Sequence, residues 1–133
     1  MISIAVKIIV SALIAYLIGS IPTGYIIVKA FTGQDIRQVG SGSTGATNVK
    51  RVMGKKWFFI VMLLDALKGA VPVLIAKYLP LLQINSAKLA GLTAVVAAIF
   101  VLLGHSKSIF LGFTGGKSVA SGVGTILALC WQD

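Results

Sequence analysis

Long apolar runs constrain the fold of this chain more than any other feature of its sequence. Residues 8–28 contain no charged side chain, and further apolar runs cover residues 57–76, 89–104 and 119–131. About 20 helical residues, each adding about 1.5 Å, cross the roughly 30 Å hydrocarbon core of a bilayer. Only 11% of the residues are charged, whereas a soluble domain carries about 25%. The sequence therefore predicts an all-α, polytopic integral membrane helix bundle.

We expect about four transmembrane helices within a single membrane domain of residues 1–133, near residues 4–28, 57–77, 88–104 and 118–132. The last run is too short to cross a bilayer and would leave backbone carbonyls in lipid, which predicts a chain shortened at its C-terminus. The first run contains residues that predict a kink or a close helix contact, namely Gly19, Ser20, Pro22 and Gly24.

Basic residues gather in two connections between these runs. Residues 29–56 hold six of the twelve Lys and Arg residues with one acid, and residues 105–117 add Lys107 and Lys117. The positive-inside rule then places both glycine-rich connections in the cytoplasm and the N-terminus outside.

The formal net charge of +9 is compatible with nucleic acid, anionic lipid or small anionic substrates. No basic helix or aromatic-interleaved RNA-binding motif occurs, so we exclude nucleic acid as a partner. Cys130 is the single cysteine and cannot form an internal disulfide. The single histidine, His105, has no second ligand at a familiar metal spacing, so we expect no metal site.

Two glycine-rich segments carry the candidate chemistry. The second, LGFTGGKSVASGVG, is similar to a nucleotide-binding loop, but Leu111 stands where the first glycine of a Walker A loop is required. Glycines still allow backbone N–H groups to converge on an anion, and a following helix N-terminus adds partial positive charge. Lys117 adds a full charge, so a bound phosphate is a reasonable expectation.

The first segment, DIRQVGSGSTGATNVKRVMGKK, combines glycines, hydroxyl side chains and basic residues. This combination suits a tetrahedral oxyanion, because all of its oxygens accept hydrogen bonds. A flexible juxtamembrane loop that binds anionic headgroups is the alternative. Within the spans, Asp65 and Lys68 lie three residues apart and predict a structural ion pair. His105 is either a helix-end hydrogen-bonding residue or a substrate contact.

Four stretches together resemble the bacterial acyl-phosphate:glycerol-3-phosphate acyltransferase family. They are GSIPTGYIIVK, the first glycine-rich segment, LLDALKGAVPV and LLGHSKSIFLGFTGGKSVASGVG. The resemblance implies an integral membrane enzyme with about seven spans and no cofactor. It would transfer an acyl chain from acyl phosphate to the 1-position of glycerol 3-phosphate, forming lysophosphatidic acid. A third cytoplasmic motif of the family has no counterpart in these residues, which again predicts a shortened chain.

The resemblance also implies roles for individual residues. Arg51 and Lys117 would hold glycerol 3-phosphate. Ser43 stands where many members have Asn. The acyl-phosphate site would comprise Ser41, Gly42, Ser43, Gly45, Thr47 and Asn48. The location would be the bacterial inner or plasma membrane, with membrane lipids and the enzyme that makes acyl phosphate as further partners.

The mechanism expected is direct attack of the glycerol phosphate hydroxyl on the acyl carbonyl, with both glycine-rich segments meeting at one pocket. Two candidates for the general base remain, His105 and a phosphate oxygen of the donor. Other functions also remain: an inactive membrane fragment, an anion- or lipid-binding module without turnover, and a small transporter.

Overall fold

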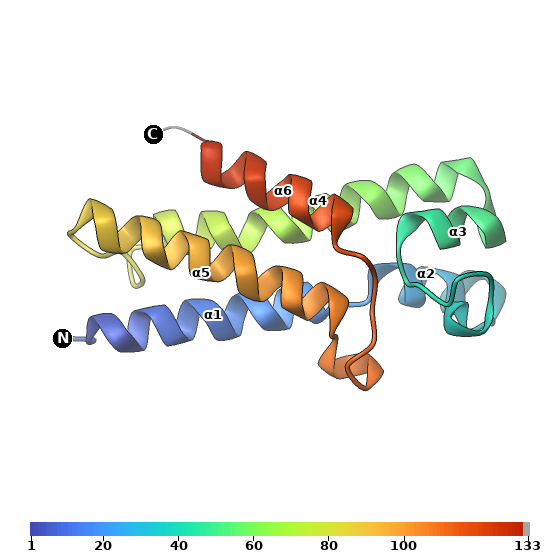
Figure 1. The fold of residues 1–133 in the computed structure, drawn as a ribbon, viewed down its shortest axis with the longest axis horizontal. Coiled ribbons are helices and arrows are strands. Elements are labelled where there is room, and N and C mark those ends of the chain that lie inside the picture. The colour runs from blue at the N-terminus through green and yellow to red at the C-terminus, as the bar shows by residue number, and fades with distance from the viewer. Residues whose placement is uncertain (132–133) are drawn as a thin grey trace.

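The computed structural model describes residues 1–131. Their regular secondary structure is entirely helical, and they contain no β-strand (Figure 1). Two short 3₁₀ turns, η1 (Ile36–Gln38) and η2 (Ile109–Leu111), lie between the longer helices. The α-helices are α1 (Ile4–Ser20), α2 (Thr23–Thr32), α3 (Ala46–Met53), α4 (Lys55–Tyr78), α5 (Ala87–Ser106) and α6 (Val119–Cys130). The prediction of an all-α bundle is confirmed.

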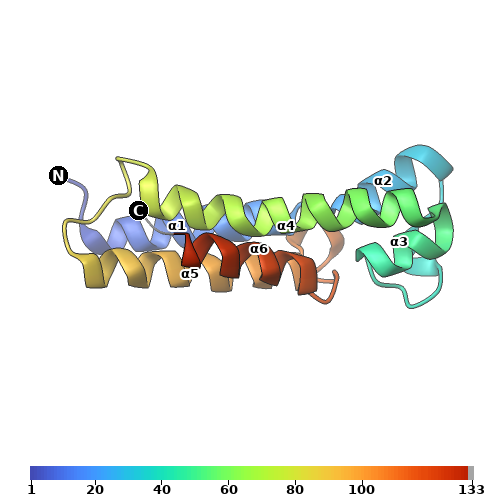
Figure 2. The same ribbon diagram turned by 90° about the horizontal axis from the view of Figure 1, so that it is seen from above.

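Four helices run along one axis, and the remaining two lie together at one end of the molecule (Figures 1 and 2). Helix α5 packs on α1, and α4 packs on both α5 and α6. Three segments are long and apolar enough to cross a membrane, Ile4–Thr32, Lys55–Tyr78 and Ala87–Ser106. Helix α6 has 12 residues, which span about 18 Å. The predicted end of the fourth span, at residue 132, lies outside the described residues.

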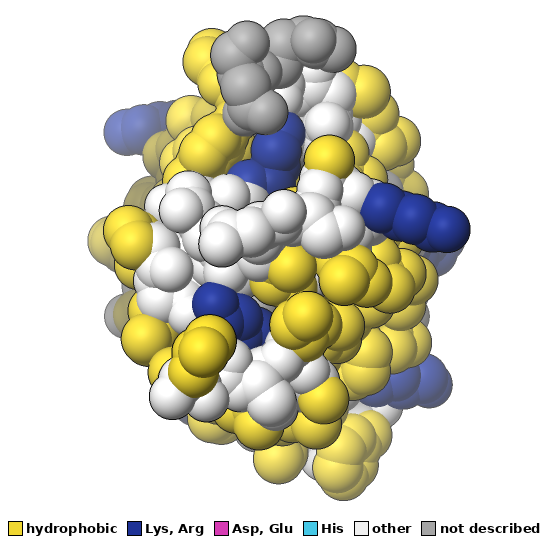
Figure 3. All heavy atoms as spheres, turned by 90° about the vertical axis from the view of Figure 1, so that its left-hand side faces the viewer, with side chains coloured by type: hydrophobic (Ala, Val, Ile, Leu, Met, Phe, Trp, Pro, Cys, Tyr) yellow, Lys and Arg dark blue, Asp and Glu magenta, His cyan; other side chains and the backbone are white. Residues whose placement is uncertain are grey.

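The outer surface of the bundle is apolar. Large side chains such as Leu13, Leu63 and Ile126 are more than half exposed. The end that carries the N-terminus is also mostly hydrophobic, with separate Lys or Arg side chains (Figure 3). Exposure of this extent suits contact with lipid rather than water, because lipid tails do not penalise apolar surface.

Small residues let the helices approach closely. A Cβ atom on Gly19 would collide with the backbone of Val101, and one on Gly104 would collide with the backbone of α1. Equivalent collisions join α4 and α6, at Gly69 against Ser121 and at Gly124 against the backbone of Ala66. Packing of this kind holds membrane helices together where no hydrophobic driving force separates helix from lipid.

The first apolar run is broken rather than continuous over residues 4–28. Helix α1 ends at Ser20, α2 begins at Thr23, and Ile21 between them has φ −58° and ψ 111°. Pro22 is the physical reason, because proline has no N–H and disfavours helical geometry in the preceding residue. The kink expected from the sequence is therefore a complete break.

The basic connection of residues 29–56 is folded and not a flexible loop. It contains the end of α2, η1 and α3, which with the start of α4 form what we call the α2–α3 lobe. The lobe has its own buried core of Val28, Ile36, Val49 and Val61. On its surface Arg37 donates to Asp35, with Nη2 2.7 Å from Oδ2, and this guanidinium lowers the pKa of Asp35 to about 2.

Candidate active site: a polar pocket at the end of the bundle

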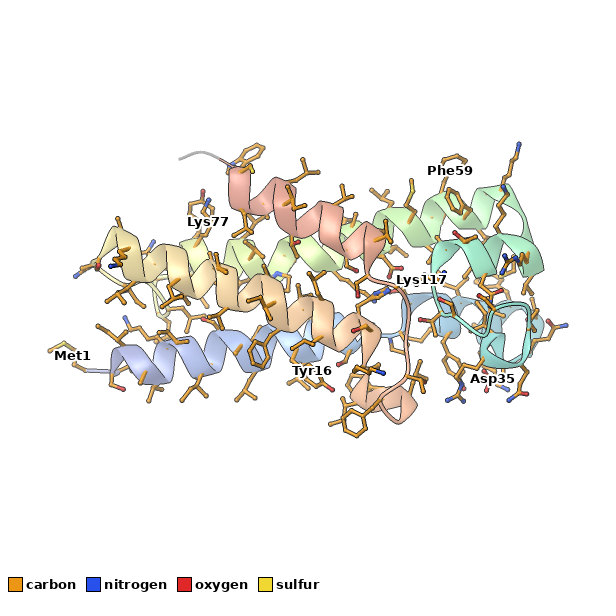
Figure 4. The ribbon with its side chains drawn as sticks, viewed as in Figure 1. Met1, Tyr16, Asp35, Phe59, Lys77 and Lys117 are labelled. Atoms are coloured by element: carbon orange, nitrogen blue, oxygen red, sulfur yellow. The ribbon has the colours of Figure 1, made fainter. Side chains whose placement is uncertain are left out.

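A polar pocket of about 170 Å³ lies where the α2–α3 lobe meets α4, α5 and the start of α6. Both glycine-rich segments contribute to it, since Ser41 and Lys117 line the same pocket. In Figure 4, Lys117 lies on the connection between α5 and α6, near the lobe. The predicted site residues that line the pocket are Ser41, Ser43, Gly45, Thr47, Asn48, Arg51, Asp65, His105 and Lys117.

Two helix N-termini border this pocket. Gly45, Ala46 and Thr47 at the start of α3 line it, as do Val119 and Ala120 at the start of α6. Neither helix has a side-chain hydrogen bond at its N-cap residue. First-turn N–H groups have no partner within a helix and carry partial positive charge. The arrangement suits an anion bound between the two helices.

The serine side chains of the first segment stabilise its own turn. Ser41 Oγ accepts from the Ser43 N–H at 3.4 Å, and Ser43 Oγ accepts from the Gly45 N–H at 3.2 Å. Of the six residues predicted to bind acyl phosphate, Gly42 is the one that does not line the pocket. It has φ +72°, a left-handed conformation that suits glycine. Its part in the segment is therefore to allow the turn.

Asn48 holds this segment together from inside. Its side chain is buried, and Nδ2 donates to the backbone carbonyls of Ile36, Val39 and Ser43 at 3.2, 2.8 and 2.9 Å. Its Oδ1 lies 3.5 Å from Arg51 Nη1. The amide N–H groups are thus engaged by the lobe itself, a structural task that the sequence pattern did not reveal.

The two predicted phosphate-binding cations come from different elements. Arg51 projects from α3, whereas Lys117 belongs to the connection between α5 and α6, and both residues are exposed. The connection is fixed to the end of α5, because Gly116 N–H donates to the His105 carbonyl at 3.1 Å and Ser118 Oγ donates to the Leu102 carbonyl at 3.0 Å. One pocket is therefore lined by two basic residues from different elements.

Asp65 and His105 form the inner wall of the pocket, at the level of the spans. Lys68 Nζ lies 3.1 Å from Asp65 Oδ1, the pair that the spacing predicted. Lys68 also donates to the carbonyl of Ile21, at the break in the first span, at 2.7 Å. His105 belongs to the last turn of α5, whereas the sequence placed the start of the second loop at residue 105.

The neighbours of His105 were not predicted. Its Nδ1 lies 3.2 Å from Ser121 Oγ on α6 and 3.8 Å from Asp65 Oδ1. On its other side, a Cβ atom on Gly116 would collide with Nε2. No spacing pattern joins residues on three different elements, so only the tertiary structure could reveal this cluster.

An apolar groove of about 320 Å³ adjoins the polar pocket. The two share three wall residues, Thr47, Val119 and Ala120. The groove continues between α4 and α6 along the side chains of Phe58, Met62, Leu63, Ala66 and Val123. A single ligand could therefore place a polar head in the pocket and an apolar tail in the groove.

Comparison with known proteins gives consistent matches. The glycerol-3-phosphate acyltransferase family model matches residues 9–132. A glycerol-3-phosphate acyltransferase of Nostoc sp. is 50% identical over 129 residues, which cover 90% of this chain and 57% of that protein. The corresponding protein of Trichormus variabilis is 52% identical over 132 residues, again covering 57% of its length.

Two solved structures are also similar. The glycerol 3-phosphate form of PlsY, an integral membrane glycerol 3-phosphate acyltransferase, has a TM-score of 0.79 and 41% identity and is covered over 57% of its chain. The lysophosphatidic acid form of PlsY has a TM-score of 0.72 and 38% identity. This chain thus spans somewhat more than half the length of the relatives it matches.

Proposed function

This chain belongs to the glycerol-3-phosphate acyltransferase family, and we propose that it transfers a fatty acyl chain from acyl phosphate to the 1-hydroxyl of glycerol 3-phosphate, releasing lysophosphatidic acid and phosphate. The observation that carries this proposal is the polar pocket with two cations and two helix N-termini, open to an apolar groove. Those features suit a reaction in which one phosphorylated substrate is water-soluble and the other has a lipid tail.

The pocket's charges support two phosphate positions. Arg51 and Lys117 provide two full positive charges, and the starts of α3 and α6 provide partial ones. We assign glycerol 3-phosphate to Arg51 and Lys117. We assign the acyl phosphate headgroup to the serine-rich turn and the start of α3, and its tail to the groove beyond Thr47.

The chemistry requires no covalent enzyme intermediate, because acyl phosphate is a mixed anhydride. The 1-hydroxyl oxygen forms a bond to the acyl carbon, and the bond from that carbon to the phosphate oxygen then breaks. Backbone N–H groups and hydroxyls would stabilise the oxyanion that develops between these steps.

A phosphate oxygen of the donor is the better supported base for this step. The Nδ1 atom of His105 faces Ser121 and Asp65, and Nε2 packs against Gly116. The ring is therefore engaged on both edges, which favours a positioning task for His105. The proton of the attacking hydroxyl would leave with the released phosphate.

The same proposal includes a membrane orientation. Six of the twelve basic residues lie between residues 29 and 56, and the positive-inside rule then places the pocket on the cytoplasmic side and the N-terminus outside. That orientation would expose the pocket to cytosolic glycerol 3-phosphate and to an enzyme that supplies acyl phosphate.

The test is an acyl transfer assay on the full chain in nanodiscs, with radiolabelled glycerol 3-phosphate and either palmitoyl phosphate or palmitoyl-CoA. We expect labelled lysophosphatidic acid from palmitoyl phosphate only. Arg51→Gln and Lys117→Gln should each raise the KM for glycerol 3-phosphate by roughly 10-fold or more, since each removes a charge-assisted contact.

Two matched controls have the same loss of charge on the same elements. They are Lys50→Gln, beside Arg51 on α3, and Lys107→Gln, on the connection between α5 and α6. Neither lysine lines the pocket. Both should keep KM within about 2-fold of the unmodified chain. Glycerol 3-phosphate binding without product would instead indicate a binding module, and gradient-driven flux in liposomes would indicate a transporter.

A further inference from the structure

Asp65 is a buried carboxylate in the wall of the polar pocket, held beside Lys68 and His105. Its residue is 2% exposed, and it lines the pocket together with His105 and Lys117. Among the described residues, no donor makes a hydrogen bond of acceptable geometry to Oδ1. An ionised carboxylate has about four acceptor sites, and leaving them empty in a buried place is unfavourable.

The neighbours of Asp65 hold it in place and leave part of its acceptor capacity open. Lys68 Nζ lies at ion-pair distance, 3.1 Å from Oδ1, and also donates a hydrogen bond to the Ile21 carbonyl. His105 Nδ1, at 3.8 Å, is beyond hydrogen-bond distance and lies closer to Ser121. The carboxylate is therefore fixed on α4 with capacity for a donor from a ligand.

The charges of the pocket differ from one side to the other. Arg51 and Lys117 attract phosphate, whereas Asp65, whose charge is balanced by Lys68, offers oxygen acceptors to hydroxyl groups. A ligand with a phosphate at one end and hydroxyls at the other would bind in one orientation only. Glycerol 3-phosphate has that arrangement.

The groove distinguishes the two hydroxyls of such a ligand. The acyl carbonyl must lie at the mouth of the groove, near Thr47 and Val119, and Asp65 does not line that groove. With the reacting hydroxyl at that mouth, the neighbouring hydroxyl would lie deeper in the pocket, on the side that Asp65 lines.

We infer that Asp65 accepts a hydrogen bond from the secondary hydroxyl of glycerol 3-phosphate and so selects this acceptor over phosphorylated alcohols that lack that group. The inference rests on the proposed function. It assigns to Asp65 a substrate contact in addition to its ion pair with Lys68.

The test compares two acceptors in the same preparation of the full chain: glycerol 3-phosphate, and 3-hydroxypropyl phosphate, which lacks only the secondary hydroxyl. Loss of one hydrogen bond to a charged acceptor weakens binding of the analogue, so we expect a preference in kcat/KM of roughly 100-fold. The double variant Asp65→Leu with Lys68→Met removes both charges at similar volume. It should narrow the preference to about 3-fold, mainly through loss with glycerol 3-phosphate.

Partial unfolding lowers the rates with both acceptors equally and leaves their ratio unchanged, so the ratio isolates the substrate contact. Ser121→Ala, which alters the other neighbour of His105, should keep the preference. If the double variant has no turnover, competitive displacement of labelled glycerol 3-phosphate by each unlabelled compound measures the preference in binding, which should likewise be narrower than in the unmodified chain.

A ratio that the double variant leaves unchanged would overturn the assignment of Asp65 while leaving the proposed function intact. A lack of product from both acceptors with the unmodified chain would overturn the proposed function and this assignment with it.

Discussion

The two glycine-rich segments contain similar residues but are held in different ways. Residues 40–48 of the first segment belong to a lobe with a buried core, and Asn48 ties this turn to three carbonyls. Residues 112–118 of the second segment have no core of their own and depend on hydrogen bonds to the end of α5. Two of its non-glycine residues, Phe113 and Ser118, have positive φ angles of 65° and 59°.

This difference predicts how the structure of each segment would respond to substitution. Packing and several hydrogen bonds stabilise the first segment, so single changes should weaken it gradually. The second depends on close approach to His105 and on strained backbone. We therefore expect it to be the more sensitive of the two to a change of one atom.

The largest effect is expected for Gly116→Ala. The added Cβ would collide with His105 Nε2 and displace the connection that carries Lys117. We expect kcat/KM to fall by roughly 100-fold, equivalent to about 2.7 kcal/mol. Gly122→Ala is the matched control, because a Cβ there meets no atom within 4 Å. Equal activity of both variants in the acyl transfer assay would contradict a close fit at Gly116.

A smaller effect is expected for Asn48→Ala. Loss of its amide leaves the carbonyls of Ile36, Val39 and Ser43 without this donor, which should destabilise the lobe by about 2 kcal/mol. Hydrogen exchange should become faster over residues 36–49 but not in α5. Gln38→Ala, an exposed amide in the same lobe, is the control and should leave exchange unchanged. Unchanged protection in Asn48→Ala would refute the role described for it.

Two substitutions of Ser118 separate the cost of its left-handed backbone from the loss of its side-chain hydrogen bond. Both Ser118→Ala and Ser118→Gly remove the bond from Oγ to the Leu102 carbonyl, but only glycine adopts φ +59° without strain. Thermal unfolding should show the alanine variant to be less stable than the glycine variant by about 1 kcal/mol. The reverse order would mean that the left-handed conformation is not maintained.

The smallest effect concerns Asp35 in the α2–α3 lobe. Arg37 lowers the pKa of Asp35 from 3.8 to about 2, so the ionised form of Asp35 stabilises the folded chain. Its contribution is complete above pH 3.8 and is lost as the pH falls toward 2. Because the pair is exposed, Asp35→Asn should change stability little at neutral pH. An NMR titration that placed the Asp35 pKa near its ordinary value would contradict the pairing.

Much of the fold could be predicted because hydropathy is a local property. The apolar runs correspond to the long helices, and Pro22 accounts for the interruption of the first. The segment 29–56 was expected to be a loop, because polar and glycine residues obscure the short helix α3 and the core around Ile36. That core forms between residues far apart in the sequence, which no local pattern reveals.

For the site residues, the sequence indicated the kind of chemistry more readily than the contacts that each side chain makes. Glycines, serines and basic residues in the two segments indicated phosphate chemistry. Those that line one pocket are Ser41, Ser43, Gly45, Arg51, Lys117 and Ser118. The engagement of Asn48 by the lobe and the contact between His105 and Ser121 were not predicted. Side-chain tasks of this kind depend on which neighbours arrive from other helices.

By itself, the sequence predicted a helical, membrane-spanning chain and two segments suited to binding phosphate, because apolar length, charge distribution and glycine content act over short stretches. Only the tertiary structure decided that α3 and α6 begin at the same pocket and that Asp65 faces into it. The physical reason is that these positions follow from close contacts between helices, such as Gly69 with Ser121 and Gly19 with Val101, which join residues distant in the chain.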